Sequence, residues 1–577
     1  MNVLKQLKKA KEYSENNELN KAEKVLNNVI KHDQNNIEAL MNLGRICFIQ
    51  NNYLKAEYYL EKVYKIAQTP ILLNNLLNIK LKLNKKEHAL EIINKLILIY
   101  PADIQLSIAR AQLLRDLGRS DEAIKILEKL SEENKNNINI LISLGFTLNK
   151  IQEYKKAISV YQKALKIDSN NFAAIYNCGI TYLNEKNDIK KAIEYLEKGL
   201  QIEKENVNLN LTLVAAYEQL REFNKAQKII KNLKIKYPKS SKVYFQSASV
   251  LIHMEKLDDA LVDVNQAIEL DNENYEAKYT KASILLKKKQ FEEGMDFYRW
   301  RVRKQNLFTK FDDININSLN RNEKLLIYFE QGLGDQILYS RFIDSINEKV
   351  EKCVVVLQEK IVNFISSNFK NIKIIAQKNY RETDYIGYKK INLASSARLV
   401  KDFENIINKP KLFKINNFVK KNMEIKYRNK KIIGISWKSE NKDIGQNKSI
   451  NLNEIIKNIN FPKEHEIINL QYGNVKKEIE LIEKKILIDE DINLYDDIDG
   501  LAGLIHQCEF VITTSNITAH ISGAIGKKTY LLVPNGMGLF WYWSKGLKVY
   551  PSINIYRQDA DGTWDSAFKL INKKIVE

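Results

Sequence analysis

A small residue recurs about every 34 positions through the first half of this 577-residue chain. The recurring residues are Ala22, Ala56, Ala89, Ala123, Ala157, Ala192, Ala226, Ala260 and Gly294, at steps of 33 to 35. A second small residue stands twelve positions before most of them, as at Ala10, Gly44 and Gly145. A fixed period of this length restricts the first half to a stack of similar units, each of which buries its apolar face against its neighbours.

The markers inside each period indicate a pair of helices. Apolar residues follow helical spacing around the small residues, as at Leu40, Leu43 and Cys47. A period of 34 is typical of tetratricopeptide repeats, so we predict an α-solenoid of about nine such repeats over residues 1–303. Leu77 and Val214 stand where a small residue is expected in repeats three and seven, and local splaying of those two hairpins is expected.

The composition leaves the partner open. The 91 basic and 71 acidic residues give a net charge of +20. One interpretation is attraction to nucleic acid, anionic lipid or another acidic partner. The other is a general bias toward Lys, Asn and Ile, with the basic residues scattered. The basic stretch 409–431 lacks the interleaved aromatic residues of a single-strand platform, so no nucleic-acid partner is expected.

Location and cofactors are constrained by what the chain lacks. No run approaches 18 consecutive apolar residues, so no membrane span is expected. The four cysteines lie far apart in apolar surroundings and fit neither a disulfide framework nor a zinc site. We expect a cytoplasmic, bacterial protein.

Beyond position 300, short apolar runs alternate with helical patterns. The candidate strands begin at Lys324, Val354, Ile372, Lys431, Ile467, Phe510 and Thr529. This alternation predicts parallel sheets. The runs form two series joined by a Lys-rich segment near 408–430, so we predict two Rossmann-like domains, 304–415 and 416–577, with a cleft between them.

Two strand ends carry candidate site residues. The first strand runs into Gly332-Leu-Gly334-Asp335, which lacks the third glycine of a dinucleotide fingerprint. Asp335 is either a helix N-cap or a general base at the carboxyl edge of the sheet. The later strand ends in Ser515-Asn516, and a helix begins near Thr518-Ala519-His520. This helix start predicts a diphosphate site or ordinary capping.

Other patterns have two interpretations each. The pairs Asp497/Asp499 and Asp559/Asp561 have the spacing of a metal–diphosphate ligand, but such pairs arise by chance among 71 acidic residues, and no metal is expected. Trp541 and Trp543 either cover a bound sugar or pack in the core.

Several motifs together resemble a known family. Q-G-L-G-D, G-I-S-W-K-S, S-N-I-T-A-H-I-S-G-A-I-G-K and Y-P-S-I-N-I-Y-R-Q look like the heptosyltransferase-like (family 9) glycosyltransferases of the GT-B fold. The variant fused behind tetratricopeptide repeats is especially similar, since its junction resembles F-E-E-G-M-D-F-Y-R-W-R at 291–301. The resemblance covers roughly 291–577.

The resemblance implies site roles. Asp335 matches the family's proposed catalytic base. The residues implied for donor binding are Gly334, Trp437, Lys438, Lys448, Gln471, Ser515, Asn516, Thr518, Ala519 and His520. Many members have Asp-Thr where this chain has Ser515-Asn516, and this departure bears on how the donor is held.

The expected function is an inverting, metal-independent glycosyltransferase without a cofactor. Its second domain would hold a nucleotide-sugar and its first domain the acceptor side. A long repeat array suits a protein or peptide acceptor, because a solenoid offers an extended concave surface. The alternative is a repeat scaffold whose transferase half is inactive.

Overall fold

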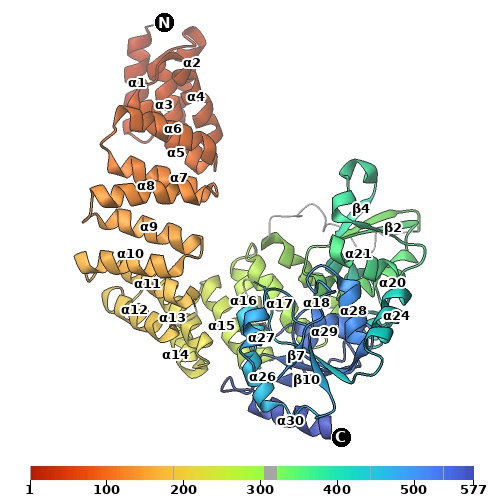
Figure 1. Cartoon of the computed structure of the whole chain (residues 1–577). Helices are drawn as coiled ribbons and strands as arrows, with labels where there is room; N and C mark the ends of the chain where they lie inside the picture. The colour runs from red at the N-terminus through yellow and green to blue at the C-terminus, as the bar shows by residue number, and fades with distance from the viewer. Residues whose placement is uncertain (1, 186–187, 305–320, 442–443, 537) are drawn as a thin grey trace. The chain divides into compact units, whose positions relative to one another are not determined.

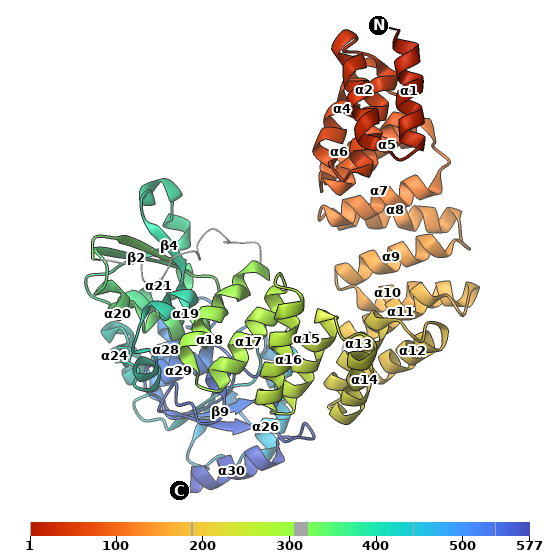
Figure 2. The same cartoon turned by 180° about the vertical axis from the view of Figure 1, so that it is seen from behind.

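The computed structural model describes residues 2–185, 188–304, 321–441, 444–536 and 538–577. The chain divides into two compact units, Met1–Leu220 and Arg221–Glu577. The division falls inside the seventh repeat, whose first helix carries Val214 in place of a small residue. Figures 1 and 2 draw both units from opposite sides, and each unit is described by itself below.

The first unit consists of paired helices that stack one pair on the next (Figure 1). Its helices are α1 (Val3–Glu15), α2 (Leu19–His32), α3 (Ile37–Ile49), α4 (Tyr53–Ile66), α5 (Pro70–Lys82), α6 (Lys86–Ile99), α7 (Ile104–Asp116), α8 (Ser120–Glu133), α9 (Ile138–Lys150), α10 (Tyr154–Ile167), α11 (Phe172–Glu185), α12 (Ile189–Ile202) and α13 (Val207–Gln219). The predicted solenoid is therefore confirmed.

The periodic small residues lie where the two helices of a pair touch. Ala22 and Ala56 are completely buried. A Cβ on Gly44 would lie 2.5 Å from Leu60 Cδ2, and one on Gly145 would lie 2.6 Å from Tyr161 Cε1. A larger side chain at these points would push the helices apart, which explains the spacing seen in the sequence.

The turn inside each pair repeats one backbone conformation. Its residue has a positive φ at Asn17, Asn51, Asn84, Gly118 and Gln152. Asn and Gly adopt this left-handed region more readily than other residues. The turns of the first unit therefore mostly follow local backbone preference.

The last repeats belong to the second unit. They comprise α14 (Phe223–Lys236), α15 (Ser241–His253), α16 (Leu257–Leu270), α17 (Tyr275–Lys287), α18 (Phe291–Tyr298) and the 3-10 helix η1 (Arg299–Lys304). Figure 2 shows α16, α17 and α18 side by side against the α/β region.

The ninth repeat shares its core with the first Rossmann-like domain. Leu286, Met295 and Tyr298 are buried in the same apolar cluster as the first sheet. The Phe291 ring lies 5.2 Å from the ring of Phe403 in that domain. Packing thus continues across 303/304, where the sequence predicts a domain limit. Residues 305–320, which open the predicted 304–415 domain, lie outside the described residues.

The turns of the last three repeats differ from the earlier ones. Arg221, Glu255 and Lys289 have φ of 60°, 58° and 62°, although none is Asn or Gly. The Arg221 guanidinium donates hydrogen bonds to Asn535 O (2.6 Å), Gln558 Oε1 (2.8 Å), Asp559 O (3.0 Å) and Ala560 O (3.1 Å). Glu255 accepts from Arg557 at 3.2 Å. At these two turns, contact with the second Rossmann-like domain replaces local backbone preference.

The first sheet is parallel, with strand order β3-β2-β1-β4. Its strands are β1 (Lys324–Tyr328), β2 (Lys352–Leu357), β3 (Lys373–Ala376) and β4 (Lys389–Asn392). Its helices are α19 (Leu333–Ser340), α20 (Ile343–Asn347), α21 (Glu359–Ser366), α22 (Leu393–Ser396) and α23 (Phe403–Asn408), with η3 (Gln377–Asn379), η4 (Glu382–Tyr385) and η5 (Ala397–Leu399).

The second sheet is parallel, with strand order β10-β9-β8-β5-β6-β7. Its strands are β5 (Ile432–Ser436), β6 (Glu466–Asn469), β7 (Ile486–Leu487), β8 (Cys508–Thr514), β9 (Thr529–Val533) and β10 (Ile553–Arg557). The helices are α24 (Asn417–Lys426), α25 (Gly445–Lys448), α26 (Leu452–Asn458), α27 (Lys476–Glu480), α28 (Ile498–Gln507), α29 (Ile517–Ala524) and α30 (Asp565–Val576), with η6 (Trp541–Trp543).

The predicted fold class, a repeat solenoid followed by two Rossmann-like sheets, is confirmed. The sequence patterns did not reveal β4, β7 and β10, which are short or lie at sheet edges. The segment near 408–430, predicted as a linker, contains α24. This helix packs on α28, since a Cβ on Gly503 would lie 2.6 Å from Val419 Cγ1.

Strand order locates the ligand-binding edge of each sheet. The order of connection reverses between β1 and β4 in the first sheet and between β5 and β8 in the second. Ligands of open parallel sheets bind beyond the carboxyl ends of the strands at such reversals. The loops that follow β1, β5 and β8 therefore form the expected site.

Within the described part of the chain, no helix combines the length and apolar composition needed to cross a bilayer.

The Arg221 contacts predict a measurable stabilisation of the second unit. Arg221→Asn keeps a residue suited to positive φ but removes four hydrogen bonds. We expect the free energy of unfolding of this unit to fall by about 1 to 3 kcal/mol, the range for hydrogen bonds of a charged group. Denaturant unfolding followed by tryptophan fluorescence measures it, because all five tryptophans lie at or beyond position 300.

Gln152→Asn is the matched control, since this exposed residue occupies the equivalent turn in the first unit. The unfolding midpoint that tryptophan fluorescence reports for this variant should equal that of the wild type. An unchanged midpoint for Arg221→Asn would mean that the contacts at this turn do not stabilise the unit.

Candidate functional site

A cavity of about 410 Å³ lies in the second unit where the strand ends of the two sheets face each other. The first turn of α19, which follows β1, contributes Gly334 and Asp335, and α25 contributes Lys448. The start of α29 contributes Ser515, Asn516 and His520. The structure thus brings together six of the residues predicted from the sequence, which are far apart along the chain.

Asp335 lies in the first turn of α19, whose N-cap is Gly332, so its carboxylate is not the predicted cap. Tyr542 donates a hydrogen bond to its Oδ1 at 3.3 Å. Burial raises the pKa of the Asp335 carboxyl to about 6, against the opposite effects of Lys448, Tyr542 and Arg301. A carboxylate with this pKa is well suited to accept a proton near neutral pH.

Lys448 brings a positive charge into the same cavity. Its side chain is 5% exposed, and its ammonium lies 4.9 Å from the centre of the Phe540 ring. Burial lowers the pKa of Lys448 to about 8, while Asp335 acts in the opposite direction. Among the described residues, its ammonium has no hydrogen bond or ion pair within 4 Å. A bound anion would compensate this buried charge.

The N-terminus of α29 opens onto the cavity. Asn516 is the N-cap, and its Oδ1 accepts from the Thr518 N–H at 2.9 Å. Its Nδ2 donates to Ser436 Oγ at 2.7 Å and to the Lys438 carbonyl at 3.1 Å. Capping therefore occurs, and it leaves the other N–H groups of the first turn and the positive end of the helix dipole for an anion.

His520 is buried beside the Gly-Leu-Gly-Asp turn. Its Nδ1 lies 3.1 Å from Tyr550 Oη. Burial, followed by Arg341 and Lys448, lowers the pKa of His520 to about 3, so the ring is neutral at physiological pH. A Cβ on Gly334 would lie 2.5 Å from His520 Cδ2. Glycine at 334 is what lets α19 and α29 approach this closely.

Five further predicted residues do not line the cavity: Trp437, Lys438, Gln471, Thr518 and Ala519. Gln471 Oε1 accepts from Ser436 Oγ and from the N–H groups of Trp437 and Lys438, at 2.9 to 3.0 Å. The Trp437 indole and the Lys438 ammonium both bind Glu478, at 2.9 and 3.0 Å. These side chains hold the loop after β5, and their contact with a donor stays a prediction.

Sequence reasoning missed several side chains that reach the site. Trp541 and Trp543 are 2% and 1% exposed and pack in the core, while Tyr542 between them contacts Asp335. Tyr472 and Tyr495 also line the cavity. Only the Trp541-Tyr542-Trp543 cluster stood out in the sequence, and the distance along the chain from Asp335 concealed the contact.

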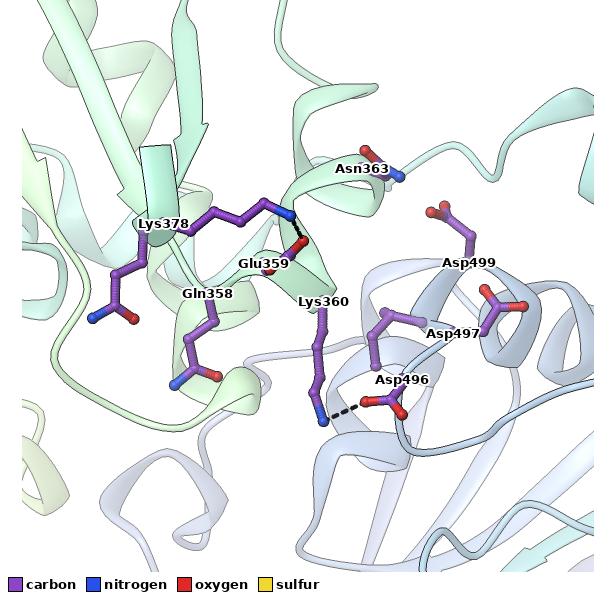
Figure 3. A pocket seen from close by; sticks show the side chains of 10 residues that line it. Gln358, Glu359, Lys360, Asn363, Lys378, Asp496, Asp497 and Asp499 are labelled. Atoms are coloured by element: carbon purple, nitrogen blue, oxygen red, sulfur yellow. Dashed lines mark hydrogen bonds and ion pairs between the residues drawn. The ribbon is translucent and has the colours of Figure 1, made fainter. Parts of the chain in front are cut away.

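A second, more open hollow of about 840 Å³ adjoins the first at Gln358, Lys360 and Ile498. Figure 3 shows Lys360 reaching Asp496, with an Nζ–Oδ1 distance of 2.6 Å, and Lys378 paired with Glu359. The Lys360–Asp496 pair joins the first Rossmann-like domain to the second.

One aspartate of each Asp-x-Asp pair has a structural role in this fold. Asp497 caps α28 by accepting from the Gly500 N–H at 2.8 Å. Asp559 accepts from the Ser566 N–H at 3.0 Å. Within the described ranges, no group of three or more His, Cys, Asp or Glu residues is arranged to hold a metal ion.

Comparison with protein families identifies the repeats. Models described as tetratricopeptide repeat match residues 7–70, 104–137 and 183–244, and one described as TPR repeat matches 147–185. The N-terminal half is therefore a tetratricopeptide repeat protein, and repeats of this class suggest protein binding.

The chain is also similar to Protein FlbA of Caulobacter vibrioides, at 22% identity over 368 residues. The match covers 57% of this chain and 60% of FlbA, so the chain spans less than two thirds of the curated relative it matches.

Among solved structures, a tetratricopeptide repeat protein from Parabacteroides merdae is 17% identical, with 42% of this chain and 97% of that chain covered and a TM-score of 0.37. A thermophilic TPR protein from Thermus thermophilus is 20% identical, with 32% and 98% covered and a TM-score of 0.28.

The raised pKa of Asp335 predicts a stability cost. Its folded-state pKa of about 6 lies above the ordinary value of 3.8, so the stability of the second unit falls as pH rises between these values. Asp335→Asn removes the buried charge. We expect it to raise the free energy of unfolding by about 1 to 3 kcal/mol at pH 8, with a smaller gain at pH 5.

Tryptophan-detected unfolding at the two pH values measures this difference. Asp344→Asn is the control, because Asp344 pairs with Lys411 at a half-exposed position; it should cause a small loss of stability at both values. A destabilised Asp335→Asn protein at pH 8 would show that ionised Asp335 stabilises the fold.

Proposed function

We propose that the second unit is an inverting, metal-independent glycosyltransferase that uses a nucleotide-sugar donor. The observation that carries the proposal is the cavity in which Asp335 faces Lys448 and the N-terminus of α29. A carboxylate with a raised pKa next to an anion site suits a reaction that removes a proton and releases a diphosphate. Two parallel sheets are compatible with the GT-B fold, and the motif resemblance points to the same reaction class.

In the proposed reaction, an acceptor hydroxyl oxygen attacks the anomeric carbon of the donor sugar. The bond from that carbon to the diphosphate oxygen breaks, and the nucleoside diphosphate leaves with the bonding electrons. Asp335 takes the hydroxyl proton. Lys448 and the N–H groups at the start of α29 stabilise the charge on the leaving diphosphate, which is the role that a metal has in other transferases.

We propose a protein or peptide as the acceptor. The repeats suggest a protein partner, and a stack of paired helices presents an extended surface on which a chain can lie.

The second candidate is a repeat scaffold with an inactive transferase half. It is favoured by Ser515-Asn516, because the Asn516 side chain already binds Thr518, Ser436 and Lys438 and the family's carboxylate is missing.

Donor binding separates the two candidates. Thermal unfolding of the full chain is followed by tryptophan fluorescence in the presence of UDP-, GDP-, CMP- and ADP-sugars. We expect one of these donor classes to raise the midpoint temperature of unfolding. A donor at 100 times its Kd adds about 2.7 kcal/mol. Lys448→Met should reduce the affinity for that donor by roughly 10-fold or more, as expected for the loss of a charged hydrogen bond.

Lys463→Met is the matched control, since Lys463 is exposed, does not line the cavity and is not among the predicted donor-binding residues. The donor affinity of this variant should stay near that of the wild type. No shift with any donor would favour the scaffold. An equal loss for both variants would mean that the effect of Lys448→Met does not arise in the cavity.

Catalysis is tested with labelled donor and a cell extract as the source of acceptors. Asp335→Asn should retain donor affinity and reduce transfer by roughly 100-fold or more, the scale of general base catalysis. The label should move into acid-precipitated protein. Full transfer by Asp335→Asn would remove Asp335 from the mechanism, and label in the lipid or oligosaccharide fraction would contradict a protein acceptor.

A further inference from the structure

The side chain of Gln331 holds the carboxylate of Asp335. The amide orientation that satisfies both neighbours points its nitrogen toward the carboxylate, 3.1 Å from Oδ1 and 3.3 Å from Oδ2. The amide oxygen then accepts from Arg301 Nε at 2.6 Å. Gln331 therefore links Asp335 to a residue of η1, the 3-10 helix that ends the repeat region.

Arg301 is itself anchored on several sides. Its Nη1 donates to the Tyr298 carbonyl at 2.9 Å and to Ser395 Oγ at 3.3 Å. Its Nη2 pairs with the buried carboxylate of Glu330, and the guanidinium lies 4.5 Å from the centre of the Tyr298 ring. Because Glu330 balances its charge, the main effect of Arg301 near the site is to fix the orientation of Gln331.

We propose that Gln331 and Arg301 are positioning residues for the catalytic base, so that the end of the ninth repeat is part of the transferase site. This inference rests on the proposed function, in which Asp335 takes the acceptor proton. An amide that spans both carboxylate oxygens restricts rotation of the Asp335 side chain. Without it, Tyr542 is the remaining side chain that donates a described hydrogen bond to the carboxylate, and the carboxylate rotates more freely.

The groups around Asp335 come from its own helix and from six further elements. Arg301 from η1, Lys448 from α25 and Tyr542 from η6 lower the pKa of its carboxyl, and neutral His520 from α29 lies nearby. Tyr279, Tyr298 and Tyr339 on α17, α18 and α19 also interact with its charge. Removing the Gln331 amide takes away two hydrogen bonds to the ionised form, so the pKa of Asp335 rises.

The test uses Gln331→Met, which has similar volume but cannot donate or accept these hydrogen bonds. We expect kcat to fall roughly 10- to 100-fold, the scale of lost alignment, with the KM for the donor unchanged. The acidic limb of the plot of kcat against pH should move to higher pH. Gln290→Met, the same change at an exposed position in the last repeat, should leave kcat and the profile at wild-type values.

Arg301→Lys is the second test variant, because lysine keeps the charge beside Glu330 but lacks the Nε–H group. As a single substitution it should lower kcat. In the Gln331→Met background it should have little further effect on kcat, since Arg301 acts through Gln331. Additive losses, a wild-type kcat for Gln331→Met, or a change in donor KM alone would overturn the proposal.

A measurement without turnover keeps this outcome separate from failure of the proposed function. The pH dependence of the stability difference between the chain and its Asp335→Asn variant reports the pKa of Asp335. In the Gln331→Met background, the midpoint of this dependence should rise. A raised midpoint without transferase activity would confirm the contact between Gln331 and Asp335 and contradict the proposed transferase function. An unchanged midpoint would refute the contact itself.

Discussion

A repeat array has an uncovered apolar face at each end, because each repeat buries its surface only against its neighbours. In the second unit, the α/β core covers the face of the ninth repeat: Leu286, Met295 and Tyr298 are buried in one cluster with the first sheet. This shared core fixes where η1 begins and brings Arg301 toward the strand ends. Covering an apolar helix face and building the surroundings of Asp335 are therefore parts of the same packing arrangement.

The site depends on a close approach between two helix starts. α19 and α29 follow strands of different sheets, and both begin at the cavity. The absence of a side chain at Gly334 makes room for His520, which is neutral because it is buried. A larger residue at 334 would separate Asp335 from the N-terminus of α29, and with it the proposed base from the proposed anion site.

Burial acts in opposite directions on the two charged groups of the cavity. It raises the pKa of Asp335 and lowers that of Lys448, since removal from water disfavours either charged form. Each group partly compensates the other. Buried charges that are only partly compensated reduce stability, and they persist in proteins where a ligand or a reaction uses them.

The sequence by itself determined the repeats, most strands and the residues at the strand ends. Period, apolar runs and turn residues are local signals, and Ala22, Gly44 and Asp335 lie where these signals place them. Only the tertiary structure decided which side chains meet. Tyr542 reaches Asp335 directly from a distant segment, and Arg301 reaches it through Gln331. Trp437 and Gln471 lie outside the cavity and support the loop after β5, which lines the cavity at Ser439 and Asn441. Sequence periodicity does not encode how the chain runs between distant segments. It also does not encode the direction of each side chain within the core.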